Sequence, residues 1–423
     1  MTTKKTDPIK RVELGDGRVR YRFVVDMDRK QKEDKRGKPI LDEDGAPIMV
    51  RDQRTFTYDT LKEARAERAR MISERSQGTL IKPNRKYTVG QAVTEFLEIK
   101  AGKKPSTRQS YYDALAPLVG RHAGLPLQAL DVPHMEALKR DMRSGKLRRL
   151  GPAGKPLSPR TVNLALGVTS MMLKWAIGRR LIHVNVAELV ERVEADQDAG
   201  VDRGEWQTAD AVAFLRFVAG DRLYAAWFLT LLGLRRGEVL GLRWDDVDLT
   251  GELARSRKLP DGTPSIGVVN NRITVKGKII EGTPKGKGRR KVTYLPIPEV
   301  LVAALKRLKA KQAAERLAAG EAYGACPLCG GAHVVADELG APFRPARYSK
   351  RFEALVKAAG LPPLVLHGGR HCAASVLGDM GYPDVVVAAW LGHTQVTITH
   401  GYQHAMAERM REAGQALGEA LAG

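Results

Sequence analysis

The sequence predicts a multi-domain chain of the α+β class, mostly helical with small β elements. Its 423 residues exceed what one ordinary core organises, since a domain holds roughly 150 residues. Strict alternation of apolar and polar residues, which indicates a half-buried strand, is confined to a few short stretches. Apolar residues at helical spacing, preceded by capping residues, occupy most of the remainder.

The first predicted domain, residues 1–80, begins with a sheet. Residues 18–25 alternate strictly, and Asp16-Gly17 is a hairpin-turn signal that pairs this run with Val12–Leu14. One face of the run is apolar and the other is cationic: Val19, Tyr21, Phe23 and Val25 against Arg18, Arg20 and Arg22. The arginine face could read DNA, since a sheet can enter the major groove, or it could be an ordinary solvated face.

The rest of this domain is predicted to be a third strand and a helix. Charged residues 29–46 are expected to form a loop, and residues 55–58 to form a strand. Thr60 and Glu63 have the spacing of a capping box, which opens a helix ending near Ser76.

Residues 88–190 are predicted to be a helical domain after a linker at 77–87. Its helices are expected to begin at Thr88 with a capping box, and to span Ser106 to Val119, Val132 to Ser144 and Ser158 to Ile182. Basic residues crowd the intervening loops, which suits contact with a phosphate backbone, although loops are commonly polar. The acidic, glycine-containing residues 192–204 indicate a second linker.

Residues 205–423 are predicted to form a mixed, mostly helical domain with a C-terminal tail helix. Thr208 is the expected N-cap of its first helix. Strands are predicted at 266–275 and 289–297, separated by a loop at 277–288, and helices follow to the end.

The composition favours nucleic acid as the partner. A net charge of +22 and a pI near 9.9 favour binding to a polyanion through counterion release, although a merely solubilising surface is the alternative. No run of about eighteen apolar residues and no signal-peptide core occur, so we expect a cytoplasmic protein without membrane contact. Three cysteines exclude a secreted disulfide framework.

Four stretches in the second half contain residues that phosphodiester transfer requires. They are GLRRGEVLGLRW with Arg235 and Glu238, TPKGKGRRK around Lys285, LHGGRH with His367 and Arg370, and WLGHTQVTITHGYQH with His393 and Tyr402. Arg235 and Glu238 are expected to share one helical face, since they lie three residues apart. Two guanidinium groups can hold the nonbridging oxygens of a phosphate bidentately.

At these residues, from about 88 to about 410, the sequence resembles the tyrosine recombinase family. The family motifs are Gly-Leu-Arg-x-x-Glu, a hairpin lysine, His-x-x-Arg-His, Leu-Gly-His and Tyr-x-His, and all five occur here in that order. Each motif alone is weak, but five in sequence are specific. Between His367 and Arg370 this chain has two glycines where the family usually has Asp-Leu, which lowers local helix propensity by about 1 kcal/mol per glycine.

The resemblance implies a role for each residue. Tyr402 attacks the phosphorus and becomes linked to the 3' phosphate, while Arg235 and Arg370 stabilise the charge. Lys285 protonates the departing 5' oxygen, His367 assists proton transfer from the tyrosine, His393 donates to the phosphate, and Glu238 holds its neighbours. The phosphotyrosine conserves the bond energy, so neither ATP nor a divalent metal is needed, and no cofactor is expected.

Some assignments have competitors in the sequence. Lys287 competes with Lys285, Arg236 and Arg243 compete with Arg235, and Tyr348 and Tyr382 compete with Tyr402. A separate segment, GACPLCGGAH, resembles half of a zinc knuckle through Cys326, Cys329 and His333. Because a structural zinc site needs four ligands and no second CxxC exists, we expect an exposed turn and no metal.

The resemblance also implies the partners and the purpose. Residues 88–190 resemble the core-site binding domain, and residues 1–80 resemble the arm-binding domain of phage integrases. An integrase of a phage or mobile element would bind double-stranded DNA attachment sites as a homotetramer in a bacterial host, with a host DNA-bending protein and an excisionase as further candidates. A type IB topoisomerase and a catalytically inactive DNA-binding regulator are the alternatives.

Overall fold

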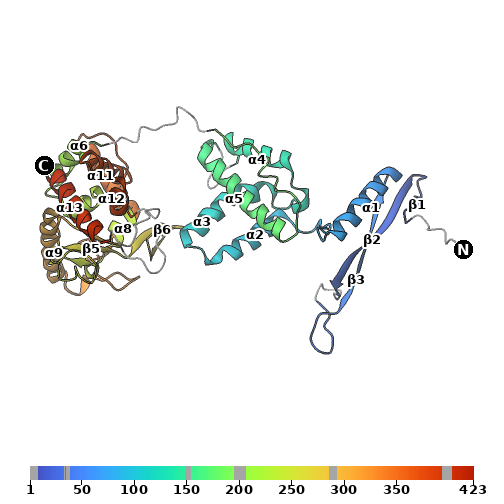
Figure 1. Cartoon of the computed structure of the whole chain (residues 1–423), viewed down its shortest axis with the longest axis horizontal. Coiled ribbons are helices and arrows are strands. Elements are labelled where there is room, and N and C mark those ends of the chain that lie inside the picture. The colour runs from blue at the N-terminus through green and yellow to red at the C-terminus, as the bar shows by residue number, and fades with distance from the viewer. Residues whose placement is uncertain are drawn as a thin grey trace. The chain divides into compact units, whose positions relative to one another are not determined.

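The computed structural model describes residues 8–32, 34, 39–147, 154–194, 206–284, 293–392 and 403–423. The chain divides into two compact units, Met1–Asp196 and Gln197–Gly423. The first unit holds two separate hydrophobic cores, one around Phe23 and one around Phe96, and the second unit holds a larger core around Trp227. The mostly helical α+β class with small sheets, predicted from the sequence, is confirmed (Figure 1).

The N-terminal part is the predicted three-stranded antiparallel sheet with one helix. Its elements are β1 (Lys10–Glu13), β2 (Val19–Gln31), β3 (Met49–Tyr58) and α1 (Leu61–Ser76), with sheet order β1-β2-β3. Phe23 and Val25 are buried while Arg22 is exposed, so the alternation separates the two faces as predicted. Thr60 caps α1 by accepting a hydrogen bond from the Glu63 amide at 3.2 Å.

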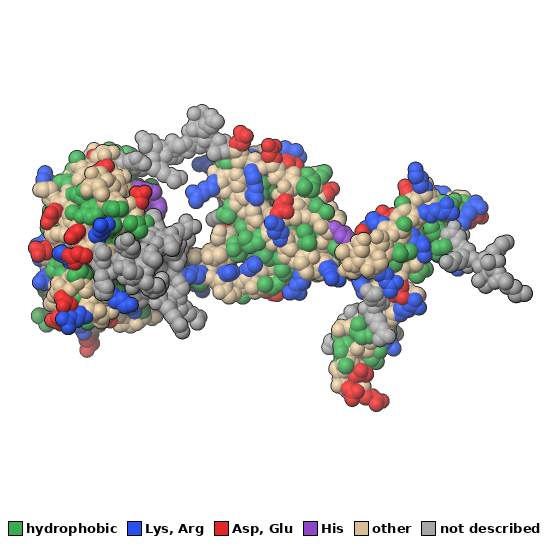
Figure 2. Space-filling model, in the orientation of Figure 1, with side chains coloured by type: hydrophobic (Ala, Val, Ile, Leu, Met, Phe, Trp, Pro, Cys, Tyr) green, Lys and Arg blue, Asp and Glu red, His purple; other side chains and the backbone are tan. Residues whose placement is uncertain are grey.

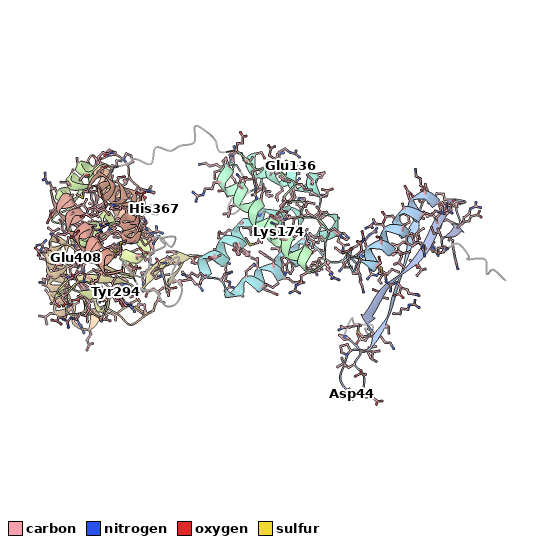
Figure 3. All side chains as sticks on the ribbon, in the orientation of Figure 1. Asp44, Glu136, Lys174, Tyr294, His367 and Glu408 are labelled. Atoms are coloured by element: carbon pink, nitrogen blue, oxygen red, sulfur yellow. The ribbon has the colours of Figure 1, made fainter. Side chains whose placement is uncertain are left out.

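The predicted loop at 29–46 is wrong at its start, because β2 extends into it as far as Gln31. Arg29 pairs with Arg51 and Gln31 with Met49, so the two strands run on as a long ribbon. Ladder hydrogen bonds need only the backbone, and this charged stretch lacked the apolar face by which a strand is recognised. Figure 2 shows acidic side chains gathered at the tip of the ribbon, and Asp44 is labelled there in Figure 3.

The helical part of the first unit is built from four helices. They are α2 (Val89–Ile99), α3 (Pro105–His122), α4 (Val132–Arg143) and α5 (Pro159–Gly178), with 3-10 turns at Lys100–Gly102 and Leu127–Ala129. Thr88 and Gln91 form the predicted capping box, with hydrogen bonds of 3.3 and 2.9 Å. Helix α5 ends at Gly178, before the predicted Ile182, because the chain reverses there through a left-handed Arg180.

The second unit packs helices around a small sheet. Its elements are α6 (Thr208–Phe217), α7 (Tyr224–Leu231), α8 (Arg236–Gly241), β4 (Val247–Asp248), β5 (Ser265–Val268), β6 (Asn271–Val275), β7 (Lys278–Gly282), β8 (Thr293–Pro296), α9 (Glu299–Ala319), α10 (Pro345–Ala358), α11 (Gly368–Asp379), α12 (Asp384–Trp390) and α13 (Gln403–Ala422), with 3-10 turns at Trp244–Asp246 and Gly320–Ala322. Strands β4, β5 and β8 form one antiparallel sheet, and β6 and β7 form a separate hairpin.

Two predictions in this unit need correction. The strand expected at 266–275 is broken into β5 and β6, because the Asn270 side chain accepts a hydrogen bond from the Asn271 amide at 2.9 Å and turns the chain. The loop expected at 277–288 therefore contains a strand, β7. Helix α6 begins at Thr208 rather than being capped by it, since the Asp210 carboxylate accepts from the Gln207 amide at 3.0 Å.

Lys and Arg side chains are spread over the visible face of the N-terminal and helical parts (Figure 2). None of the helices in the described segments is both long and apolar enough to cross a membrane. The predicted linker at 192–204 falls mostly outside the described residues.

Candidate active site

A small pocket in the second unit collects residues from distant parts of the chain. Its wall comes from the turn between α7 and α8, from β5 and β8, from α11 and from the end of α12. The lining residues are Leu232, Gly233, Leu234, Arg235, Glu238, Val268, Thr293, Leu295, Arg370, Trp390, Leu391 and Gly392. Three residues predicted from the sequence, Arg235, Glu238 and Arg370, therefore lie on one surface.

Arg235 is held by Glu238 at the start of α8. The Glu238 carboxylate accepts from the Arg235 backbone amide and from its Nη1, both at 2.9 Å. The two side chains therefore meet as their spacing predicts, although Arg235 is the N-cap residue just before the helix and does not lie within it. The Glu238 side chain is 5% exposed and that of Arg235 is 29% exposed, so the buried carboxylate orients a guanidinium that remains accessible.

Arg370 is buried and its orientation is fixed by backbone carbonyls. Its Nη1 donates to the Gly233 carbonyl at 2.8 Å, and its Nη2 donates to the Leu391 carbonyl. Burial, and then repulsion from Arg235, lower the pKa of Arg370 to about 10, so the side chain is still cationic at neutral pH. Two cations that destabilise each other in a partly buried pocket are stabilised when an anion binds between them.

Gly233 makes this arrangement possible. Its φ of +94° lies in the region that favours glycine, and an added Cβ would lie 2.8 Å from Leu391 Cδ2. The tight turn between α7 and α8 therefore brings the Gly233 carbonyl to the Arg370 guanidinium.

His367 immediately precedes α11, and its side chain is exposed (Figure 3). Partial burial of the ring, followed by the positive potential of His371, Arg370 and Arg235, lowers the pKa of His367 from its ordinary 6.5. The imidazole is therefore neutral at pH 7 and can accept a proton. At the unusual glycine pair, a Cβ on Gly369 would lie 3.1 Å from the Thr230 carbonyl oxygen, so glycine allows α11 to start against α7.

Arg236, Arg243 and Tyr348, which the sequence left as competing candidates, make contacts away from the pocket. Arg236 Nη1 donates to Ser349 Oγ at 2.8 Å, and Arg243 Nε donates to Asp246 at 3.0 Å. Neither arginine lines the pocket that contains Arg235. The Tyr348 hydroxyl is fully buried, where it donates to the Ala226 carbonyl at 3.0 Å, and burial raises its pKa far above that of a usable nucleophile.

Residues 218–409 match the model of the phage integrase family. This domain belongs to the phage integrase family. The family predicted from the five motifs, that of the tyrosine recombinases, is thereby confirmed.

Two curated relatives and one solved structure are similar to this chain. A XerC-like tyrosine recombinase of Caldanaerobacter subterraneus subsp. tengcongensis is 32% identical over 202 residues, which cover 47% of this chain and 50% of that protein. The ICEBs1 integrase of Bacillus subtilis is 23% identical over 271 residues, which cover 63% of this chain and 67% of that protein. The chain thus spans half the length of the first of these relatives.

The solved structure is that of the Tn1549 transposon integrase in complex with transposon right end DNA. It is 20% identical, covers 77% of this chain and 99% of that chain, and aligns with a TM-score of 0.57. At this identity the likeness shows a shared fold, in agreement with the fold class predicted from the sequence.

Four predicted residues of the integrase domain, Lys285, Lys287, His393 and Tyr402, lie outside the described residues. Their described neighbours in the chain still bear on the prediction. Gly392, which precedes His393 in the chain, lines the pocket.

The predicted cations of the N-terminal sheet are partly engaged with carboxylates. Arg18 pairs with Asp16 at 2.5 Å, and Arg20 pairs with Asp59 at 2.9 Å, whereas Arg22 is exposed. Nucleic acid would therefore compete with two solvent-exposed ion pairs, a class that is generally weak because water and salt screen the charges.

A cluster of metal-ligand types lies elsewhere in the integrase domain. Cys326, Cys329 and His333 lie beside Glu281, which the sequence analysis missed. No sequence motif indicates Glu281 as a metal ligand, because it lies 45 residues before Cys326. The expectation of an exposed turn is wrong for Cys326 and His333, which are 2% and 1% exposed.

Proposed function

We propose that this chain is a site-specific DNA recombinase that integrates, and excises, a phage or other mobile element. The observation that carries the proposal is the meeting of Arg235 and Arg370 in one pocket of a phage integrase family domain. Two preorganised guanidinium groups match the charge that develops on the nonbridging oxygens of a phosphodiester under attack.

The proposed reaction is a transesterification without net loss of bond energy. The Tyr402 oxygen forms a bond to phosphorus while the bond to the 5' oxygen breaks, leaving a 3'-phosphotyrosyl link. The tyrosine proton passes to the neutral His367 imidazole, and Lys285, or Lys287 in its place, protonates the leaving 5' oxygen. His393 donates a hydrogen bond to the phosphate. A 5' hydroxyl from the partner duplex then reverses the step and joins the strands.

The proposed partners are double-stranded DNA attachment sites and three further copies of the chain. The net charge of +22 supports DNA binding, and the Tn1549 integrase of similar fold is in complex with DNA. A host DNA-bending protein and an excisionase remain part of the proposal, as does action on DNA in the cytoplasm of a bacterial host.

A mixture of the protein with two distinguishable duplexes, each carrying an attachment site taken from DNA that flanks the gene, tests the function. We expect recombinant joints between the duplexes without ATP. Relaxation of supercoiled DNA without joints would instead support a type IB topoisomerase. Binding without any covalent product would support the inactive regulator.

We also propose three domains, with residues 1–80 binding arm-type sites, 88–190 binding the core site and 205–423 carrying catalysis. Deleting residues 1–80 is expected to spare core-site cleavage and to reduce integration about a hundredfold, because linked binding modules commonly gain 10²- to 10⁴-fold in avidity. Both rates are measured on the same preparation, so cleavage serves as the control for folding. Integration at the full rate would contradict the arm-binding assignment.

Substituting alanine for Arg18, Arg20 and Arg22 in the full-length chain refines this test. If the arginine face contacts DNA, arm-site affinity falls and becomes less dependent on salt, because fewer counterions are released.

A further inference from the structure

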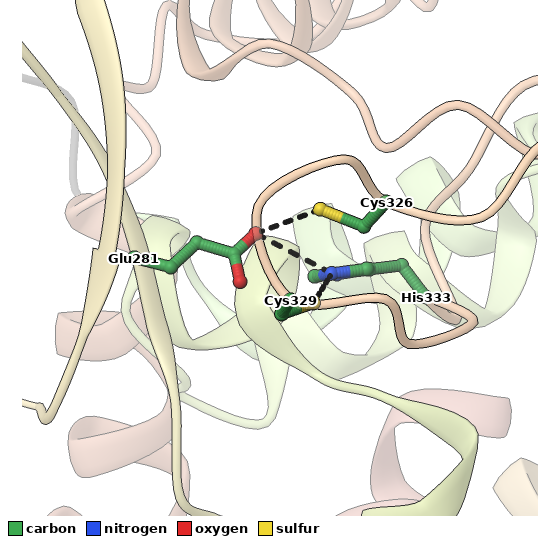
Figure 4. A group of neighbouring side chains, drawn as sticks. All are labelled: Glu281, Cys326, Cys329 and His333. Atoms are coloured by element: carbon green, nitrogen blue, oxygen red, sulfur yellow. Dashed lines mark hydrogen bonds and ion pairs between the residues drawn. The ribbon is translucent and has the colours of Figure 1, made fainter.

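Four side chains that can bind a metal converge beside the β6–β7 hairpin. Glu281 lies on β7, and Cys326, Cys329 and His333 lie on the loop between α9 and α10. One ligand atom from each residue lies within 4.8 Å of each of the others. Figure 4 shows the Glu281 carboxylate directed at the loop, where it contacts Cys326 and His333, and His333 in turn contacts Cys329.

The loop is shaped to present both sulfurs on one side. The Gly330 amide donates to the Cys326 carbonyl at 2.8 Å, and the Cys326 amide donates to the Gly331 carbonyl at 3.3 Å, which closes a tight turn. Gly330 has a φ of +67° at this turn, a backbone conformation that favours glycine. A CxxC turn closed in this way has the ligand spacing of structural zinc sites.

His333 is set in the tautomer that a metal requires. Its Nδ1 lies 3.0 Å from the Leu240 carbonyl oxygen, which can only accept, so Nδ1 carries the proton. The lone pair of Nε2 then faces the other ligands, 3.4 Å from Cys329 Sγ and 3.4 Å from Glu281 Oε1. A backbone carbonyl that orients the ring in this way is the usual outer partner of a ligating histidine.

The charges around the cluster balance if a divalent ion is present. Two thiolates, one carboxylate and a neutral imidazole give a divalent complex a net charge of −1. Arg272 supplies the compensating positive charge, because its Nη1 contacts Glu281 and lies 3.5 Å from Cys326 Sγ. The Arg272 side chain is 5% exposed, so its charge is a fixed part of the site.

We propose that Glu281, Cys326, Cys329 and His333 bind one structural Zn²⁺ ion. Two thiolates with an imidazole favour zinc over the hard cations Mg²⁺ and Ca²⁺, and four protein ligands close the tetrahedron. Bonds of about 2.0–2.3 Å place ligand atoms about 3.3–3.8 Å apart in such a tetrahedron. The ligand atoms of the cluster, which lie within 4.8 Å of one another, need only a small contraction to reach this spacing. The sequence has no second CxxC pair that could complete the site. The fourth ligand is instead the Glu281 carboxylate, which comes from β7.

The ion would join three segments of the domain. It bridges β7 to the loop between α9 and α10, and the His333 contact to Leu240 extends the link to α8. Arg235 immediately precedes α8, and Lys285 follows Glu281 by four residues. This consequence rests on the proposed function: the ion would hold in place the two segments next to Arg235 and Lys285, which are both proposed catalytic residues.

Metal content of the full-length, untagged protein tests this proposal independently of recombination. Elemental analysis of reduced protein is expected to give about one zinc per chain. Cys326→Ala, Cys329→Ala and Glu281→Gln should each reduce the zinc content, while Cys372→Ala, which removes a buried thiol outside the cluster, should keep it. Less than about a tenth of a zinc per chain, or full zinc in the ligand variants, would overturn the site.

Cobalt substitution keeps the test decisive if the ligand variants fail to fold. The wild-type protein loaded with Co²⁺ is expected to show strong visible bands of a tetrahedral ion and sulfur-to-cobalt charge transfer. A weak octahedral spectrum without sulfur bands would contradict the ligand set. So would a Cys326–Cys329 disulfide in a peptide map of freshly purified protein. Because neither measurement uses DNA, failure of this site is distinguishable from failure of the recombinase proposal.

Discussion

Tyr402→Phe is expected to form no covalent complex with a DNA duplex nicked near the crossover, whereas the unaltered chain accumulates one. The nick lets the short 5' fragment diffuse away, so the phosphotyrosyl product cannot be reversed. Phenylalanine keeps the ring and removes only the oxygen that we propose attacks phosphorus. Loss of a nucleophile that acts with its partners costs on the order of 10⁴-fold or more, which puts the product below detection on a denaturing gel.

Tyr382→Phe is the matched control, since it removes one phenolic oxygen from the same unit at a half-buried position. It is expected to trap DNA as the wild type does. DNA binding by Tyr402→Phe, measured by mobility shift, should be unchanged. A covalent product with Tyr402→Phe would show that another residue is the nucleophile, and mapping the DNA-linked peptide would identify it.

Helix starts were predictable from the sequence because their hydrogen bonds are local. Thr88 caps α2 and Ser158 caps α5 at the residues where capping signals occur, since each side chain satisfies an amide three residues ahead. Strand limits depend on partners elsewhere in the chain. The long β2–β3 ribbon follows from pairing that no short window of sequence contains.

The side chains of the candidate site were predictable from the sequence where they belong to a sequence motif. Arg235, Glu238 and Arg370 were predicted, and the pocket brings them together. The carbonyls of Gly233 and Leu391 were not, because every residue has a carbonyl and only the fold decides which ones reach Arg370. Glu281 was missed for the same reason, since its neighbours are set by tertiary packing.

Arg370→Lys is expected to slow cleavage of the suicide substrate about 10²- to 10³-fold, equivalent to about 2.7–4 kcal/mol of transition-state stabilisation. The guanidinium of Arg370 donates to two carbonyls and still has N–H groups for a phosphate oxygen. A lysine ammonium has one nitrogen and cannot span both carbonyls and the phosphate. Single-turnover cleavage with protein in excess gives the rate directly.

Arg236→Lys is the matched control, because Arg236 bonds Ser349 and does not line the pocket. Its cleavage rate should stay within about twofold of the wild type, as expected for a surface substitution. Because an unsatisfied buried carbonyl also costs stability, the thermal midpoint of Arg370→Lys is measured alongside the rate. A folded Arg370→Lys variant that cleaves at the wild-type rate would remove Arg370 from the catalytic proposal.

Combining Arg370→Lys with Arg235→Lys distinguishes one phosphate site from two independent ones. If both guanidinium groups hold the same phosphate, replacing either one already weakens binding of that phosphate in the transition state. The cleavage rate of the double variant should then fall by less than the product of the two single reductions. Losses that multiply would indicate that the two arginines act on separate groups.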